Sequence, residues 1–217
     1  SYYRAKEVIK LICLIQKDLE SHPEIRKKLN VVFMENYCVT MAENLIPAAE
    51  VSEQISLAGK EASGTSNMKF MINGALTLGT EDGANVEMHQ AVGDDNIFIF
   101  GMNADEVAET WAKGYNSMDY YFKNPRLRVV VDELNNGFAG ETFEGVSNYL
   151  LRSNGMADPY MCFADFADYV ATADRMDKAY RDVDEWNRMS LKNISEAGRF
   201  SADRAVREYA TKIWHMN

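Results

Sequence analysis

One lysine beside a loop of small residues is the feature of this sequence that could do chemistry. Lys69 follows the run Ala-Ser-Gly-Thr-Ser at residues 62–66 and lies in the first turns of an apolar segment. Consecutive backbone N–H groups at the start of a helix can bind an anion. Burial among apolar residues lowers the pKa of a lysine, so that its amine can form a Schiff base with an aldehyde. The combination predicts a site for a phosphorylated aldehyde, of which pyridoxal phosphate is the obvious example.

Other interpretations of the same segment remain open. A lysine near a helix start can extend its charge to water along an apolar stem, and a loop of small residues can be a plain helix cap. Gly59 and Gly64 are spaced as in a nucleotide-triphosphate loop. However, Thr65 and Ser66 stand where that motif requires Lys followed by Ser or Thr, and Lys69 lies too far along the helix to replace it.

Acidic and aromatic groups elsewhere are better explained by structure than by chemistry. Glu81, Asp82 and Glu87 could form an acid–base set, but Asp-Gly at residues 82–83 is a strong turn signal, so we expect a solvated turn. An aromatic cluster follows Gly114, and we interpret it as packing. Its members are Tyr115, Tyr120, Tyr121 and Phe122.

Cysteines and histidines are scattered along the chain. The odd number of cysteines and the lack of a C-x-x-C pair favour reduced thiols and a cytoplasmic location. Neither residue type shows the spacing of zinc ligands, so no metal site is predicted. The residues are Cys13, Cys38, Cys162, His22, His89 and His215.

Bulk properties exclude several classes of protein. The net charge of −10 argues against a nucleic-acid surface, which needs clustered Lys and Arg. The sequence contains no run of 18 apolar residues, so no membrane span is predicted. The chain opens on Ser within a helical pattern, so it looks like a piece of a longer polypeptide, although removal of an initiator Met would also explain this start.

Hydrophobic periodicity predicts an α/β fold with a Rossmann-like parallel sheet flanked by helices, followed by a helical region. We expect one compact unit, in which residues 1–102 alternate helices and strands and residues 103–217 are mainly helical. The expected strands are Leu29–Met34, Val51–Leu57, Ala75–Leu78 and Asn96–Phe100. The expected helices of the first part are an opening helix, 23–28, 39–45, 66–73 and 84–91, of which 66–73 is apolar enough to be buried all round. Those of the second part are 104–115, 125–134, 141–152, 163–180, 184–194 and a last helix capped by Ser201.

The segment Glu61–Met88 resembles the pyridoxal-phosphate segment of the α-glucan phosphorylases, a family that includes the glycogen, starch and maltodextrin phosphorylases. Further similar motifs extend over nearly the whole chain, so the resemblance does not rest on one short motif. They are Glu35-Asn36-Tyr37, Ile46-Pro47-Ala48-Ala49, Ser52-Glu53-Gln54-Ile55-Ser56, residues 96–101 (Asn-Ile-Phe-Ile-Phe-Gly), Phe200-Ser201-Ala202-Asp203-Arg204 and Ile213-Trp214.

The resemblance implies roles for individual residues. Lys69 would hold pyridoxal phosphate as a Schiff base, and Tyr37 would pack near the cofactor ring. Thr65 and Ser66 would contact the cofactor phosphate. Ser66 stands at a position where members of the family often have Gly. The glucosyl unit would be bound by Glu61 together with the backbone of the next three residues. Those three residues are Ala62, Ser63 and Gly64.

The resemblance also implies the activity and its limits. The parent enzyme would cleave terminal α-1,4-linked glucose from a glucan with inorganic phosphate, giving glucose 1-phosphate. This chain matches part of the C-terminal domain of a two-domain fold, and the basic residues that grip the substrate phosphate lie upstream, as does the N-terminal domain. We therefore expect the isolated chain to be inactive, and we expect the full-length form to be able to form a homodimer. The alternatives are a non-catalytic carbohydrate- or phosphate-binding domain and a sugar-nucleotide glycosyltransferase of related fold, which would have no use for Lys69.

Overall fold

The computed structural model describes residues 2–152 and 156–216. Contacts divide the chain into two compact units, which we describe separately. Unit 1 comprises Ser1–Cys38 and Tyr115–Ala164, and unit 2 comprises Val39–Gly114 and Asp165–Asn217. This division follows packing, whereas the boundary expected after residue 102 follows the type of secondary structure.

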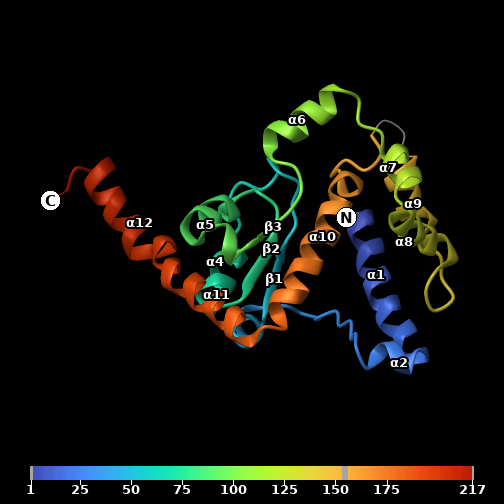
Figure 1. The fold of residues 1–217 in the computed structure, drawn as a ribbon, viewed down its shortest axis with the longest axis horizontal. Coiled ribbons are helices and arrows are strands. Elements are labelled where there is room, and N and C mark those ends of the chain that lie inside the picture. Colours follow the sequence, from blue (N-terminus) through green and yellow to red (C-terminus); the bar gives the residue numbers. More distant parts are fainter. Residues whose placement is uncertain (1, 153–155, 217) are drawn as a thin grey trace. The chain divides into compact units, whose positions relative to one another are not determined.

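Unit 2 is built on a three-stranded parallel sheet, which confirms the predicted α/β class. The strands are β1 (Val51–Gln54), β2 (Leu76–Gly79) and β3 (Phe98–Ile99), in the order β1-β2-β3 (Figure 1). The register pairs Gln54 with Gly79, and Gly79 with Ile99, so the carboxyl ends of the strands lie at one edge of the sheet. The loops that follow these strands therefore meet at that edge, where open parallel sheets bind ligands.

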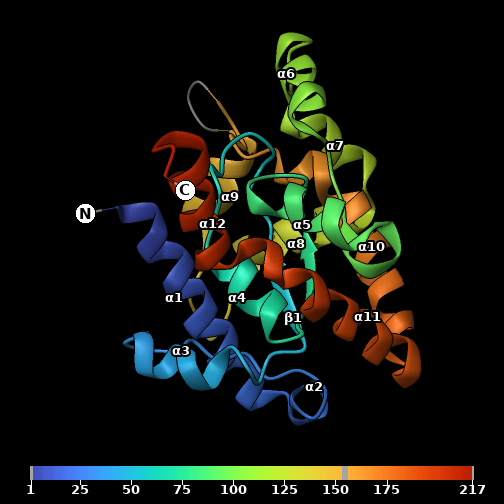
Figure 2. The ribbon, with the colours of Figure 1, turned by 90° about the vertical axis from the view of Figure 1, so that its left-hand side faces the viewer.

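Helices cover this sheet. Helix α11 contacts α4, α5 and β2. Figure 2 shows α4, α5 and α11 from a second direction. The helices that lie wholly within unit 2 are α3 (Val39–Leu45), α4 (Ser66–Ile72), α5 (Ala84–Val92), α6 (Ala104–Ala112), α11 (Val183–Glu196) and α12 (Ala202–Glu208), with short helical turns η2 (Asp94–Asn96), η3 (Ala197–Phe200) and the π-helical η4 (Tyr209–Ile213). Helix α10 (Cys162–Tyr180) begins in unit 1 and continues into unit 2.

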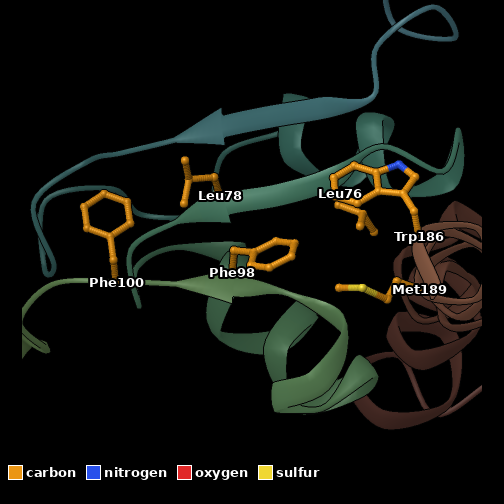
Figure 3. Close-up of a cluster of buried hydrophobic side chains, with 6 residues drawn as sticks. All are labelled: Leu76, Leu78, Phe98, Phe100, Trp186 and Met189. Atoms are coloured by element: carbon orange, nitrogen blue, oxygen red, sulfur yellow. The ribbon is translucent and has the colours of Figure 1, made fainter. Parts of the chain in front are cut away.

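The main core of unit 2 lies between the sheet and the helices α10 and α11. Alternate residues Leu76 and Leu78 of β2 face Phe98 of β3, and α11 adds Trp186 and Met189 (Figure 3). The rings of Phe98 and Trp186 stack with centroids 6.2 Å apart. Burial of these large apolar side chains is the main source of stability for the sheet.

Unit 1 is helical. Its core joins Leu134, Phe143 and Val146 to partly buried residues of the first helix, including Leu11 and Leu14. The helices are α1 (Tyr3–Asp18), α2 (Pro23–Arg26), α7 (Ser117–Lys123), α8 (Pro125–Asn136) and α9 (Glu144–Leu151), with the short η1 (Leu19–Ser21) after α1. The sequence pattern does not predict helix α7, which contains three members of the aromatic cluster.

Several expected elements are confirmed. Helix α3 has the predicted bounds, and the Ser201 side chain caps α12 by accepting a hydrogen bond from the Arg204 N–H. The predicted strand at Val51–Leu57 is shorter, because β1 ends at Gln54.

The predicted strand at Leu29–Met34 is wrong. These residues form no regular structure, and Leu29 and Val32 are 51% and 53% exposed. The Phe33 N–H donates to the side chain of Gln16 instead of to a neighbouring strand. A β-forming apolar run becomes a strand only when a second strand takes its hydrogen bonds, and local sequence does not supply that partner.

No helix within the described part of the chain combines the length and the apolar character needed to cross a membrane.

Candidate functional site

The candidate site lies in unit 2, where the loop after β1 meets the turn after β2. The loop runs from residue 55 to residue 65 and leads into α4, and the turn runs from residue 80 to residue 83 and leads into α5. Both connections start from the carboxyl edge of the sheet. The topology therefore brings the predicted lysine segment beside the Asp-Gly turn.

Asp82 holds the loop in place. Its Oδ1 accepts a hydrogen bond from the backbone N–H of Gly59 at 2.8 Å. Its Oδ2 accepts from the backbone N–H groups of Glu61 at 2.8 Å and of Lys60 at 3.3 Å. The side chain is buried, with Asp82 7% exposed. A carboxylate bonded to several backbone N–H groups is well stabilised, and these charge-assisted bonds are stronger than neutral ones. The expectation of a solvated acidic turn is therefore wrong for Asp82.

Buried polar side chains extend this network toward the helices. Asn85 donates to the backbone oxygen of Thr80 at 3.1 Å and accepts from Asn67 at 3.0 Å. Thr80 in turn donates its hydroxyl to the Ser56 carbonyl at 2.5 Å. Because each group has a partner, the network can fix the loop without the cost of unpaired buried polar atoms.

Gly83 allows the turn and the loop to approach closely. Its φ is +53°, and an added Cβ would lie 2.6 Å from the Ser63 carbonyl oxygen. That same oxygen accepts a hydrogen bond from the Ala84 N–H at 2.6 Å. Only glycine combines this backbone conformation with the absence of a clashing side chain.

A small polar cavity of about 100 Å³ opens at this junction. Carboxylate, hydroxyl and amide groups surround it, and such groups hydrogen-bond to polar ligands such as sugars and phosphates. Its lining residues are Gln54, Ser56, Glu61, Gly64, Ser66, Asn67, Asp82 and Asn85.

Lys69 lies on the exposed side of α4, and the predicted burial of this helix on all sides is wrong. The helix buries Asn67 and Met71, whereas Lys69 is exposed and Ile72 is 58% exposed. Lys69 and Met71 are two residues apart, which places them on opposite faces of a helix. The lysine is therefore not held in an apolar pocket in this chain, and it does not line the cavity.

Most of the other expected site residues of unit 2 lie in the loop itself, and Ser66 follows it as the first residue of α4. Glu61 and Gly64 line the cavity, whereas Ala62 and Ser63 are exposed. Ser66 lines it too, and its hydroxyl accepts a hydrogen bond from Gln54 at 3.2 Å.

Two expected residues are not brought into the cavity lining. Thr65 is the residue before α4 and is exposed, and its side chain makes no capping hydrogen bond. Tyr37 belongs to unit 1 and is 59% exposed. Its predicted place near the cofactor ring stays a prediction.

Sequence reasoning missed the residues that organise the site. Asp82, Asn85 and Asn67 are polar yet buried, and their sequence spacing gives no periodic signal. A better signal for Asp82 is its position in the turn that follows the predicted strand ending at Leu78, because polar residues beyond the carboxyl ends of parallel strands lie at the ligand edge. No group of three or more His, Cys, Asp or Glu residues that could hold a metal ion occurs within residues 2–152 and 156–216.

Comparison with known proteins gives a consistent result. The family model for carbohydrate phosphorylases matches residues 1–216. The chain is 47% identical to the liver form of glycogen phosphorylase from Homo sapiens over 99% of its length, and 46% identical to the muscle form from Bos taurus over 98%. It covers 25% of each of these relatives, so it spans about a quarter of their length. This chain therefore belongs to the carbohydrate phosphorylase family.

Proposed function

We propose that this chain is the cofactor-binding segment of an α-glucan phosphorylase. The parent enzyme cleaves terminal α-1,4-linked glucose with inorganic phosphate and releases glucose 1-phosphate. The observation that carries this proposal is the loop at residues 59–64, which Asp82 holds beside the start of α4. An ordered loop of this kind presents polar groups at fixed positions, which a site that transfers a glucosyl unit to phosphate needs.

The residues present fit pyridoxal phosphate in part. The exposed Lys69 side chain can be reached by an aldehyde, and the Ser66 hydroxyl lies in the first turn of the same helix. A cavity of about 100 Å³ is too small to enclose the whole cofactor. It supports contacts with one end of the ligand, so groups outside this chain would complete the pocket.

Each residue has a distinct task in this proposal. Lys69 would anchor the cofactor, Thr65 and Ser66 would contact its phosphate, and Tyr37 would pack near its ring. When bound, pyridoxal phosphate would supply a phosphate group with acid–base character close to the substrate.

The loop itself binds the sugar. Glu61 accepts hydrogen bonds from hydroxyls of the glucosyl unit, and the backbone at Ala62, Ser63 and Gly64 fixes the orientation of the ring. Because Asp82 already holds the amide groups at 59–61, little loop entropy remains to be lost on binding.

The chain alone does not contain a complete catalytic set. The proposal places the basic groups that bind substrate phosphate upstream of these 217 residues, so the isolated chain should not turn over glucan. The cytoplasmic location expected from the cysteines and the homodimer of the full-length form belong to the same proposal.

Borohydride trapping tests the proposal directly. The full-length polypeptide is incubated with pyridoxal phosphate, reduced, digested and mapped by mass spectrometry. We expect a phosphopyridoxyl label on Lys69 that disappears in Lys69→Ala and persists in Lys60→Ala, which changes another exposed lysine of the same region. A label distributed over surface lysines, or none on Lys69, would favour a sugar-nucleotide glycosyltransferase or a non-catalytic binding domain.

A further inference from the structure

His89 on α5 is a titratable group that the proposed site does not use. Its Nδ1 lies 2.9 Å from Oε2 of Glu81, and its Nε2 lies 2.7 Å from Oδ1 of Asp94. Glu81 precedes α5 and Asp94 follows it, so one imidazole ring joins the two ends of the helix. The side chain of His89 is 25% exposed.

This double contact fits the protonated form of the ring. An ionised carboxylate only accepts hydrogen bonds, and a neutral imidazole has one N–H to donate. Both contacts are therefore satisfied together when both nitrogens carry protons. Partial burial alone would lower the pKa of His89, but the hydrogen bonds and charges of Glu81 and Asp94 outweigh it and raise the pKa above its usual value.

The charged groups on the elements that pack against α5 are directed elsewhere. Arg199 of η3 lies 3.9 Å from Glu87, on the same helix as His89. Arg188 of α11 donates to Glu185 and to Asn96, and Lys192 of α11 pairs with Glu196, whereas Lys69 of α4 is exposed. Glu81 and Asp94 are thus the carboxylates that set the charge state of the ring.

The contact reaches the sugar-binding loop through adjacent residues. Glu81 is the residue directly before Asp82, whose carboxylate accepts hydrogen bonds from the backbone N–H groups of residues 59–61. On the other side of Asp82, Gly83 lies against the Ser63 carbonyl, which accepts a hydrogen bond from the Ala84 N–H. Fixing the Glu81 side chain therefore restricts a turn that contacts the loop at both of its ends.

We propose that His89 is a positioning residue whose protonated ring holds Glu81, and with it the loop at residues 59–64, and that loss of the proton loosens this loop. The inference rests on the proposed function for the statement that the loop binds a sugar. Its structural part, the coupling of the histidine to the loop, does not depend on any cofactor or substrate.

Amide hydrogen exchange of the full-length polypeptide tests this coupling. Protection factors of a peptide covering residues 57–66 are measured across the pH range in which His89 loses its proton. We expect protection to fall about fivefold, because this is the order of the net contribution of one solvent-accessible hydrogen bond. His89→Gln should remove this pH dependence, and His22→Gln should retain it, because His22 is an exposed histidine of unit 1.

A second variant should shift the pH at which the protection of the loop changes, instead of abolishing the change. Asp94→Asn removes one of the two carboxylates that stabilise the protonated ring, so the midpoint of the loop transition should shift to lower pH. Exchange of the imidazole C2 hydrogen, followed by mass spectrometry, should report the same shift for His89. The Asp94 side chain is 95% exposed, so this variant should fold even if His89→Gln does not.

The exchange experiments test the coupling of His89 to the loop independently of whether Lys69 binds pyridoxal phosphate. The inference would be overturned if the protection of the loop did not depend on pH, or if it changed with pH equally in His89→Gln. It would also be overturned if Asp94→Asn left the midpoint of the loop transition unmoved. A loop that titrates with His89 while borohydride leaves Lys69 unlabelled would support the positioning role and count against the proposed function.

Discussion

The loop at residues 55–65 and the segment at residues 27–38 both join regular elements, but they are held in different ways. The loop at 55–65 is tied to the turn at 80–83 by a buried carboxylate and by backbone contacts. The segment at 27–38 contains more apolar residues, yet Leu29 and Val32 are more than half exposed. Apolar side chains that pack against no other surface hardly restrict the conformation of their segment. One buried polar group whose hydrogen bonds are all made can hold a whole loop in place.

The largest expected effect in this comparison is that of Asp82→Ala. It leaves the amides of Gly59, Lys60 and Glu61 without their acceptor, so we expect a loss of about 2–4 kcal/mol in the free energy of unfolding. Urea unfolding measures this loss. Asp184→Ala, which changes an exposed aspartate of the same unit, should stay within about 0.5 kcal/mol of the parent. Equal effects of the two changes would show that Asp82 does not organise the loop.

Gly83→Ala should be the next most damaging change. The new Cβ would meet the Ser63 carbonyl at 2.6 Å in a backbone conformation that L-residues rarely adopt, and we expect a cost of about 1–3 kcal/mol. Gly93→Ala is the matched control, because Gly93 also has a positive φ but nothing lies within 4 Å of its added Cβ. Thermal unfolding of both variants separates the clash from the backbone strain, and a larger loss in Gly93→Ala would contradict the close contact at Gly83.

A smaller effect is expected on the contribution of His89 to the free energy of unfolding when the pH changes. Because the pKa of His89 is raised in the folded chain, its contribution to stability is complete below the pKa of the unfolded state and is lost as pH rises through the folded pKa. The difference in unfolding free energy between the parent and His89→Gln should therefore shrink by about 1 kcal/mol between mildly acidic and mildly alkaline solution. Urea titrations at several pH values check this, and a difference that grows with pH would reverse the assigned sign.

The smallest effect should be that of Val32→Ser in the segment at 27–38. Val32 is 53% exposed, so we expect a change within about 0.5 kcal/mol for the 217-residue chain in urea unfolding. Leu78→Ala, in the fully buried core of unit 2, provides the contrast and should cost about 2–5 kcal/mol. A large loss in Val32→Ser would mean that this segment packs against a surface after all.

Local signals explain the parts of the structure that the sequence predicted well. Ser201 caps α12, and Asn124 with Pro125 starts α8, because capping acts within one turn of the helix. The lysine segment was placed correctly after β1 for the same reason: glycine and small residues mark a loop, and the following residues have helical spacing.

Long-range contacts explain what the sequence did not predict. The hydrogen bonds of Asp82 reach residues 21 to 23 positions earlier in the chain, and its turn signal reports only its immediate neighbours. The exposure of Lys69 depends on which face of α4 meets the rest of the unit. The sequence of this short helix does not reveal that face, because the polar Asn67 is buried whereas the apolar Ile72 is exposed. The strand expected at Leu29–Met34 failed because its partner is not specified locally.

The division into two units also gives the protein two natural sets of probes. All three tryptophans, Trp111, Trp186 and Trp214, belong to unit 2. The three cysteines, Cys13, Cys38 and Cys162, belong to unit 1, and all are exposed. Intrinsic fluorescence therefore reports the melting of one unit, and labels attached to the thiols report the other. If the two signals change at different denaturant concentrations, the chain unfolds in more than one step.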